Sequence, residues 1–190
     1  MLNNTPKLPT QVYLTIRKLR RNIMAARNPK EVFLMLLSDA RRNTERSAAL
    51  YREISEAAEN PDVKEALEAR SFIAKKDLET LDKCFDLIGE KPVKLSGRLQ
   101  EVFIEDFRRE LSEIQSPAAR HLYVLAKAKH LAHLRIAEYT MLVAAADVTE
   151  HYGVGVLLES VLADKLAFLE RDRRIIRHVI EGKIAERLAA

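Results

Sequence analysis

Apolar residues recur along this chain at spacings of three, four and seven positions, which is the pattern of helices that bury one face. The stretch from residue 63 to 92 shows it clearly, with a stripe made of Val63, Ala66, Ile73, Leu81, Cys84 and Ile88. No segment shows the sustained alternation of apolar and polar residues that is typical of a half-buried strand. The sequence therefore predicts an all-α protein.

Three dipeptides mark the starts of long helices: Asn28-Pro29, Asn60-Pro61 and Ser116-Pro117. In each, a residue whose side chain can cap a helix precedes a proline, which suits the first helical turn. Together with the apolar spacing, they predict helices over residues 9–27, 29–59, 61–88, 97–114, 117–150 and 154–188.

The lengths of the connections predict how these helices pack. The helices over 29–59 and 61–88 are almost continuous, as are those over 117–150 and 154–188, so each pair should fold back as a hairpin. A long connection with one short helix joins the hairpins. This is the arrangement of a ferritin-like four-helix bundle. We expect residues 1–28 to form a basic N-terminal arm with its own helix and residues 29–190 to form the bundle.

Charged residues interrupt the apolar stripes near the middle of the long helices. Because a buried charge is costly unless it is paired, we expect these residues to form one buried polar centre: Glu45, Arg70, Asp77, Arg135 and Asp164. Carboxylates paired with arginine there would have depressed pKa values. The alternative is a helical phase that is off by one position, which would place Arg70 and Arg135 at the surface.

Ferritin-like bundles commonly hold two metal ions through glutamates and Glu-x-x-His motifs. No Glu-x-x-His or Asp-x-x-His occurs in this chain. We therefore expect no metal cofactor. If iron or manganese does bind, the available carboxylates are Glu45, Asp77 and Asp164.

The chain resembles the YciE/YciF group of ferritin-like bacterial stress proteins over about residues 34–175. The resemblance rests on "NPDVKEALEA", "LETLDKCFDLIGEKP", "RIAEYTMLVAAA" and "LLESVLADKLAFL". It implies the bundle fold, a stress-associated role and a homodimer.

The metal-centre pattern of that family carries over poorly. Its first glutamate has a counterpart in Glu45, but its other ligand positions are occupied here by Ile73, Asp77, Ala132, Arg135, Ala163 and Asp164. The resemblance therefore implies a degenerate centre, in which we expect arginine to take the place of the metal cations, because a guanidinium can bind two carboxylates.

The positive charge of the chain is concentrated at its start. Residues 1–30 contain seven basic and no acidic residues, whereas the net charge of the whole chain is only +4. An apolar stripe of Val12, Ile16, Leu19 and Ile23 runs beside the basic cluster of Arg17, Lys18, Arg20 and Arg21. We interpret this arm as a helix that packs on the bundle or on a second subunit. The alternatives are contacts with anionic lipid, nucleic acid or an acidic protein partner. Specific nucleic-acid binding is not expected, since there is no helix-turn-helix signature.

Cys84 is the only cysteine, which excludes an intrachain disulfide and favours a reducing, cytoplasmic location. The apolar runs are too short for a transmembrane segment.

The first functional hypothesis is a non-catalytic, stress-associated ferritin-like protein that acts through oligomerisation or partner binding. The alternatives are a di-iron or di-manganese oxidoreductase or iron-handling protein with a non-standard carboxylate site, and a basic module that associates with polyanions or membranes.

Overall fold

The structure, a computed structural model, describes residues 26–58, 60–95 and 98–189. Within these ranges the chain forms helices and no strand. The helices are α2 (Pro29–Glu56), α3 (Pro61–Ile88), α4 (Leu99–Glu113), α5 (Pro117–Val148) and α6 (Tyr152–Ala189). The predicted all-α class is confirmed, and the boundaries differ from the predicted ones by a few residues. The helix predicted over residues 9–27 lies outside the described residues, apart from its last two positions.

The three predicted caps are formed. Asn28 accepts a hydrogen bond from the backbone N–H of Glu31 at 2.9 Å, and Asn60 accepts from Asp62 and Val63. Ser116 starts α5 in the same way. These bonds satisfy N–H groups that the first turn leaves without a helical partner. At the other end of α3, Gly89 adopts the left-handed conformation with φ of 66°, which ends the helix.

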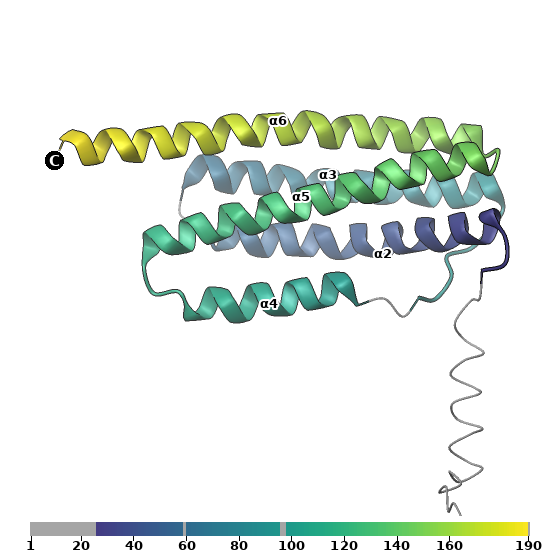
Figure 1. Ribbon diagram of the computed structural model, residues 1–190, viewed down its shortest axis with the longest axis horizontal. Helices are drawn as coiled ribbons and strands as arrows, with labels where there is room; N and C mark the ends of the chain where they lie inside the picture. The colour runs from purple at the N-terminus through teal and green to yellow at the C-terminus, as the bar shows by residue number, and fades with distance from the viewer. Residues whose placement is uncertain (1–25, 59, 96–97, 190) are drawn as a thin grey trace, which may run out of the picture.

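The four long helices form a bundle in which α2 and α5 are neighbours, as are α3 and α6 (Figure 1). Within the hairpins, α2 packs on α3 and α5 packs on α6, which completes the ring of four neighbouring helices. The crossover from α3 to α5 runs back along the bundle and contains α4, which lies against α2 and α5. This connectivity is the predicted one and is that of the ferritin-like fold.

The crossover helix is attached by one buried ring and several polar contacts. Phe107 is fully buried, and Gln100 donates a hydrogen bond to Ser47 of α2 at 2.8 Å. Arg108 forms a two-pronged ion pair with Glu53 of α2. These contacts hold α4 on the face that α2 and α5 share.

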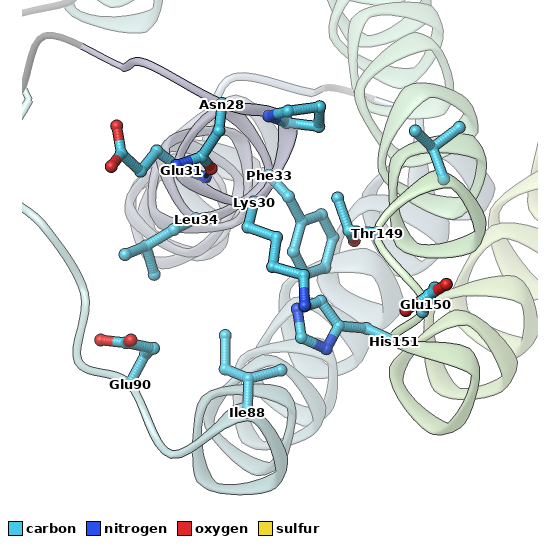
Figure 2. Close-up of a pocket in the computed structure, with 12 residues that line it drawn as sticks. Asn28, Lys30, Glu31, Phe33, Leu34, Ile88, Glu90, Thr149, Glu150 and His151 are labelled. Carbon is cyan, nitrogen blue, oxygen red and sulfur yellow. Dashed lines mark hydrogen bonds between the residues drawn. The ribbon is translucent and has the colours of Figure 1, made fainter.

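A hollow of about 600 Å³ lies at the end of the bundle where α2 begins and α5 turns into α6 (Figure 2). Its floor includes Phe33, whose ring stacks on that of His151 at 5.3 Å between centroids. The α5–α6 turn passes through Glu150, which has a positive φ of 65°. The hollow is therefore built from three chain segments: the start of α2, the end of α3 and the α5–α6 turn.

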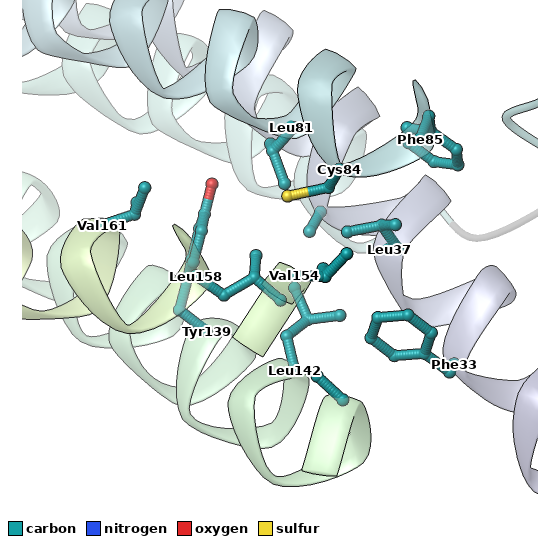
Figure 3. Close-up of a cluster of buried hydrophobic side chains, with 12 residues drawn as sticks. Phe33, Leu37, Leu81, Cys84, Phe85, Tyr139, Leu142, Val154, Leu158 and Val161 are labelled. Carbon is teal, nitrogen blue, oxygen red and sulfur yellow. The ribbon is translucent and has the colours of Figure 1, made fainter. Parts of the chain in front are cut away.

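Two apolar clusters form the core of the bundle. The first lies toward the α5–α6 turn and includes Leu37, Leu81 and Leu158, each fully buried (Figure 3). The second lies toward the α2–α3 turn and takes in Phe107 of α4. Burial of each such leucine or phenylalanine contributes about 1.5–3 kcal/mol. Cys84 lies within the first cluster, and burial raises the pKa of its thiol to about 11, so this cysteine is a core residue with little thiolate.

The two clusters leave a gap between them along the bundle axis. On α2 the gap lies between Ala40 of the first cluster and Leu50 of the second. Buried polar residues fill this stretch of α2: Asn43, Thr44 and Ser47. No helix among the described residues has the uninterrupted apolar length that a bilayer span requires.

Candidate functional site

The centre of the bundle holds a small polar cavity of about 40 Å³, lined by side chains from all four long helices. Three of the five residues predicted for a buried polar centre line it. Arg70 is 9% exposed, Asp77 is 3% exposed and Arg135 is 4% exposed. Their burial excludes the alternative phase for α3 and α5, in which both arginines would reach the surface.

The other two predicted members, Glu45 and Asp164, do not belong to this centre, and the prediction is wrong for both. The buried face of α2 passes through Thr44 and Ser47, which turns Glu45 outward. The side chain of Glu45 is 62% exposed and lies near Arg41 on its own helix. Asp164 is also exposed.

The helical phase explains the error on α6. Among the described residues of α6, the buried apolar side chains are Val154, Leu158 and Val161, and the same spacing leads next to Lys165 rather than to Asp164. Starting the stripe at Val154 and Leu158 would have identified Lys165 from the sequence. A second apolar stripe, through Leu157 and Val161, leads by the same spacing to Asp164, the residue that was predicted.

Lys165 is paired with Asp77 inside the bundle. Its ammonium donates a hydrogen bond to Oδ2 of Asp77 at 2.5 Å, and the two side chains are 16% and 4% exposed. The same ammonium lies 4.6 Å from the centre of the Tyr139 ring. Burial lowers the pKa of Lys165, and the charge of Asp77 opposes this effect. Asp77 and Lys165 thus link α3 to α6.

Arg135 binds α2 and its own helix, not the carboxylates that the sequence suggested. Its guanidinium donates to the backbone oxygen of Ala40 at 3.0 Å and to the hydroxyl of Thr44. It also forms an ion pair with Glu138, one turn further along α5. Its expected partners were Glu45, Asp77 and Asp164.

Glu138 is a member of the site that the sequence analysis missed. Its carboxylate accepts a hydrogen bond from the side-chain amide of Asn43 at 2.6 Å. Burial raises the pKa of Glu138, although the charge of Arg135 opposes the rise. This corrects the expectation that carboxylates beside arginine would have depressed pKa values, because here desolvation outweighs the attraction.

Arg70, which also lines the cavity, contacts two aromatic rings. It donates a hydrogen bond to the hydroxyl of Tyr51 at 3.1 Å. Its guanidinium carbon lies 5.4 Å from the centre of the Tyr51 ring and 5.7 Å from that of Phe168. Both distances are within the range of a cation–π contact. The cavity is therefore lined by three cationic side chains, from α3, α5 and α6.

These residues do not fit a di-metal centre. Among the described residues lining the cavity, Asp77 is the only carboxylate, and it already binds Lys165. The part of the chain that the structure describes contains no group of three or more His, Cys, Asp or Glu side chains placed to hold a metal ion. The fallback set of Glu45, Asp77 and Asp164 is not assembled. A cavity of this volume is large enough to hold a water molecule.

The basic cluster proposed for partner contacts, Arg17, Lys18, Arg20 and Arg21, lies outside the described residues. The described residues begin at Ala26 and Arg27, which connect the arm to the start of α2. The backbone N–H of Arg27 donates a hydrogen bond to the carboxylate of Glu31 at 2.6 Å.

Solved structures with the same arrangement of helices agree with this fold. The Escherichia coli stress protein YciF has a TM-score of 0.76 and 20% identity, with 82% of this chain and 99% of that chain covered. YcfI from Rhodopseudomonas palustris has a TM-score of 0.74 and 21% identity, covering 78% and 95%. A protein from Xanthomonas campestris pv. campestris has a TM-score of 0.66 and 16% identity, covering 85% and 99%.

No curated protein sequence matches the chain. A family model does, over residues 28–187, and its description is a domain of unknown function, DUF892. The match covers all five described helices except the last residues of α6. The resemblance to YciF-like ferritin-like proteins is thereby confirmed, and the chain belongs to the DUF892 family.

Proposed function

We propose that this chain is a non-catalytic ferritin-like protein, associated with stress, in which a buried cluster of cations and carboxylates replaces the di-metal centre. The observation that carries the proposal is the lining of the central cavity by Arg70, Arg135 and Lys165. Three cations would repel Fe²⁺ or Mn²⁺, and the residues that could bind a metal are already paired. The description of the E. coli relative as a stress protein supports the physiological part of the proposal.

The cluster has a structural role in this proposal. It links α3 to α6 through Asp77 and Lys165, and α5 to α2 through Arg135. In a metal-binding bundle the ions provide such links between helices. Here side-chain ion pairs and hydrogen bonds provide them, so the bundle does not depend on metal supply. We infer that the protein acts through its surfaces, by assembly or partner binding, in a reducing cytoplasm.

We expect the purified protein, after incubation with ferrous iron or Mn²⁺ and removal of excess metal, to retain well below one ion per chain. Elemental analysis measures this directly. Asp77→Asn should leave any residual content unchanged, as should the exposed control Asp86→Asn. A reproducible content of about two ions per chain, lost in Asp77→Asn only, would contradict the proposal and support an oxidoreductase or iron-handling protein instead.

We propose that assembly is homodimeric and uses the surface of the α5–α6 hairpin near its turn. Large apolar side chains are exposed there: Met141 at 59%, Tyr152 at 64% and Val156 at 67%. These side chains come from the helix segments that flank the α5–α6 turn, and an exposed apolar surface of this kind is typical of an interaction site.

We expect the wild type to have the mass of a dimer in solution, and Val156→Glu to shift it toward the monomer, because a charge would be buried in the interface. Light scattering after size-exclusion chromatography measures the mass. Leu122→Glu is the matched control: Leu122 is 58% exposed and lies near the opposite end of α5. Equal masses for all three proteins would reject this surface as the interface.

A further inference from the structure

The hollow at the end of the bundle combines an apolar floor with an acidic rim (Figure 2). The apolar part consists of Phe33 and Leu34 from α2, Ile88 from α3 and Val148 from α5. Val148 is 72% exposed, Leu34 and Ile88 are half-buried, and Phe33 is fully buried beneath them. A hollow of about 600 Å³ is large enough to take several apolar side chains from another segment.

Three carboxylates surround this apolar floor. Glu31, Glu90 and Glu150 line the hollow, from the start of α2, the loop after α3 and the α5–α6 turn. Lys30 is the one lysine or arginine among the lining residues of this pocket. The rim is therefore negative, in a chain whose net charge is positive. An occupant that suits it would present apolar side chains flanked by cations.

The N-terminal arm of the same chain has these properties. Residues 1–25 contain five basic residues and no acidic ones. The four apolar residues of the stripe recur at helical spacing beside the basic cluster: Val12, Ile16, Leu19 and Ile23. The arm also joins the bundle at the hollow itself, since Asn28 and Pro29 line it.

We propose that the hollow binds the arm of its own chain, with residues of the apolar stripe over Leu34, Ile88 and Val148 and the basic cluster facing Glu90 and Glu150. Four residues separate Ile23 from Asn28, and an extended residue spans about 3.3–3.6 Å, which is enough for the chain to reverse over the rim. Tethering so close to the site gives the arm a high effective concentration, which favours it over a separate partner.

The experiment uses the absence of tryptophan from the sequence. Leu19→Trp in the full-length chain provides a single tryptophan in the apolar stripe of the arm, which excitation at the red edge selects over the five tyrosines. We expect blue-shifted emission and slow quenching by acrylamide. Adding Glu90→Lys and Val148→Glu to this chain should shift the emission to that of an exposed tryptophan. Adding Glu68→Lys and Leu122→Glu, which make the same changes on exposed positions near the other end of the bundle, should leave it unchanged.

Circular dichroism checks that each variant is folded. If the double substitution at the hollow unfolds the bundle, Glu90→Lys alone replaces it, since Glu90 is exposed and follows α3. Added salt should also red-shift the emission of the parent variant, because screening weakens the contact with the rim.

Several results would overturn the proposal. One is exposed-type emission from Leu19→Trp in the otherwise unchanged chain. Another is blue-shifted emission that survives the substitutions at the hollow, which would place the arm elsewhere on the bundle. A blue shift lost on dilution, together with dissociation of a dimer, would show that the arm binds a second copy. A blue shift seen only with added DNA or anionic vesicles would make the arm a polyanion-binding segment.

Discussion

Replacement of Arg135 by alanine is expected to lower the free energy of unfolding by about 3–5 kcal/mol, the usual cost of breaking one side of a buried ion pair. The guanidinium is 4% exposed and serves three acceptors at once: the carbonyl of Ala40, the hydroxyl of Thr44 and the carboxylate of Glu138. The alanine variant would leave Glu138 with only Asn43 as its hydrogen-bond partner. Urea unfolding followed by circular dichroism measures the difference.

Arg52→Ala is the matched control, because Arg52 is an exposed arginine on α2. Its replacement should change the stability by no more than about 0.5 kcal/mol. If Arg135→Ala behaved like this control, the guanidinium would have no structural role in the centre, and the proposed replacement of metal by cations would fail.

The pH dependence of this variant follows from the raised pKa of Glu138. A carboxyl group whose pKa is higher in the folded than in the unfolded protein contributes stability at low pH that is lost as the pH rises through its folded value. Removal of Arg135 takes away the charge that opposes this rise, so the pKa should increase further. We expect the stability gap between wild type and Arg135→Ala to narrow as the pH is lowered from neutral into the acid range. A gap that widened on acidification would contradict the assignment of Glu138 as the partner.

The pair of Asp77 and Lys165 should show the second large effect. Lys165→Met leaves a carboxylate that is 3% exposed without its 2.5 Å partner, and Asp77→Leu leaves the ammonium buried among cations. Each single substitution should cost about 3–5 kcal/mol. The double variant should recover most of this loss, because a buried ion pair replaced by apolar residues of similar volume is often close to neutral. Urea unfolding of the four proteins completes the cycle.

Lys83→Met provides the control for the lysine substitution, since Lys83 is exposed on α3. If the two single losses simply added in the double variant, Asp77 and Lys165 would not be coupled. The direct ion pair would then have to be rejected.

Alkaline pH offers a separate test of Lys165. Its pKa is lowered in the folded protein, so between that value and the ordinary value of 10.5 the unfolded chain binds more protons than the folded one. The stability that Lys165 contributes through this shift is therefore fully present above its unfolded-state pKa. It is lost as the pH falls through its lowered folded-state pKa. Lys165→Met should lack this component of the pH dependence, whereas Lys83→Met should retain it.

The sequence by itself determined the fold. The capping residues Asn28, Asn60 and Ser116 and the prolines after them set the starts of three helices, because these interactions are local. Short connections within each pair and one long connection between the pairs then left the ferritin-like arrangement as the solution. The apolar spacing also placed Arg70, Asp77 and Arg135 on buried faces, because the apolar residues of α3 and α5 keep a regular helical spacing on both sides of these positions.

The tertiary structure decided which charges meet. A shift of one residue on α6 exchanges Asp164 for Lys165, and it turns a predicted excess of carboxylates into an excess of cations in the cavity. One position turns a side chain by about 100° around the helix, since 3.6 residues make a turn. The sequence of α6 offers one apolar stripe through Val154 and Leu158 and another through Leu157 and Val161, and packing against the other helices decides which of them is buried. The choice of Glu138 by Arg135, and the assembly of the hollow from three distant segments, depend on how neighbouring helices sit against each other. The distances between neighbouring helices are set by the packing of the whole bundle, and no local pattern in the sequence encodes that packing.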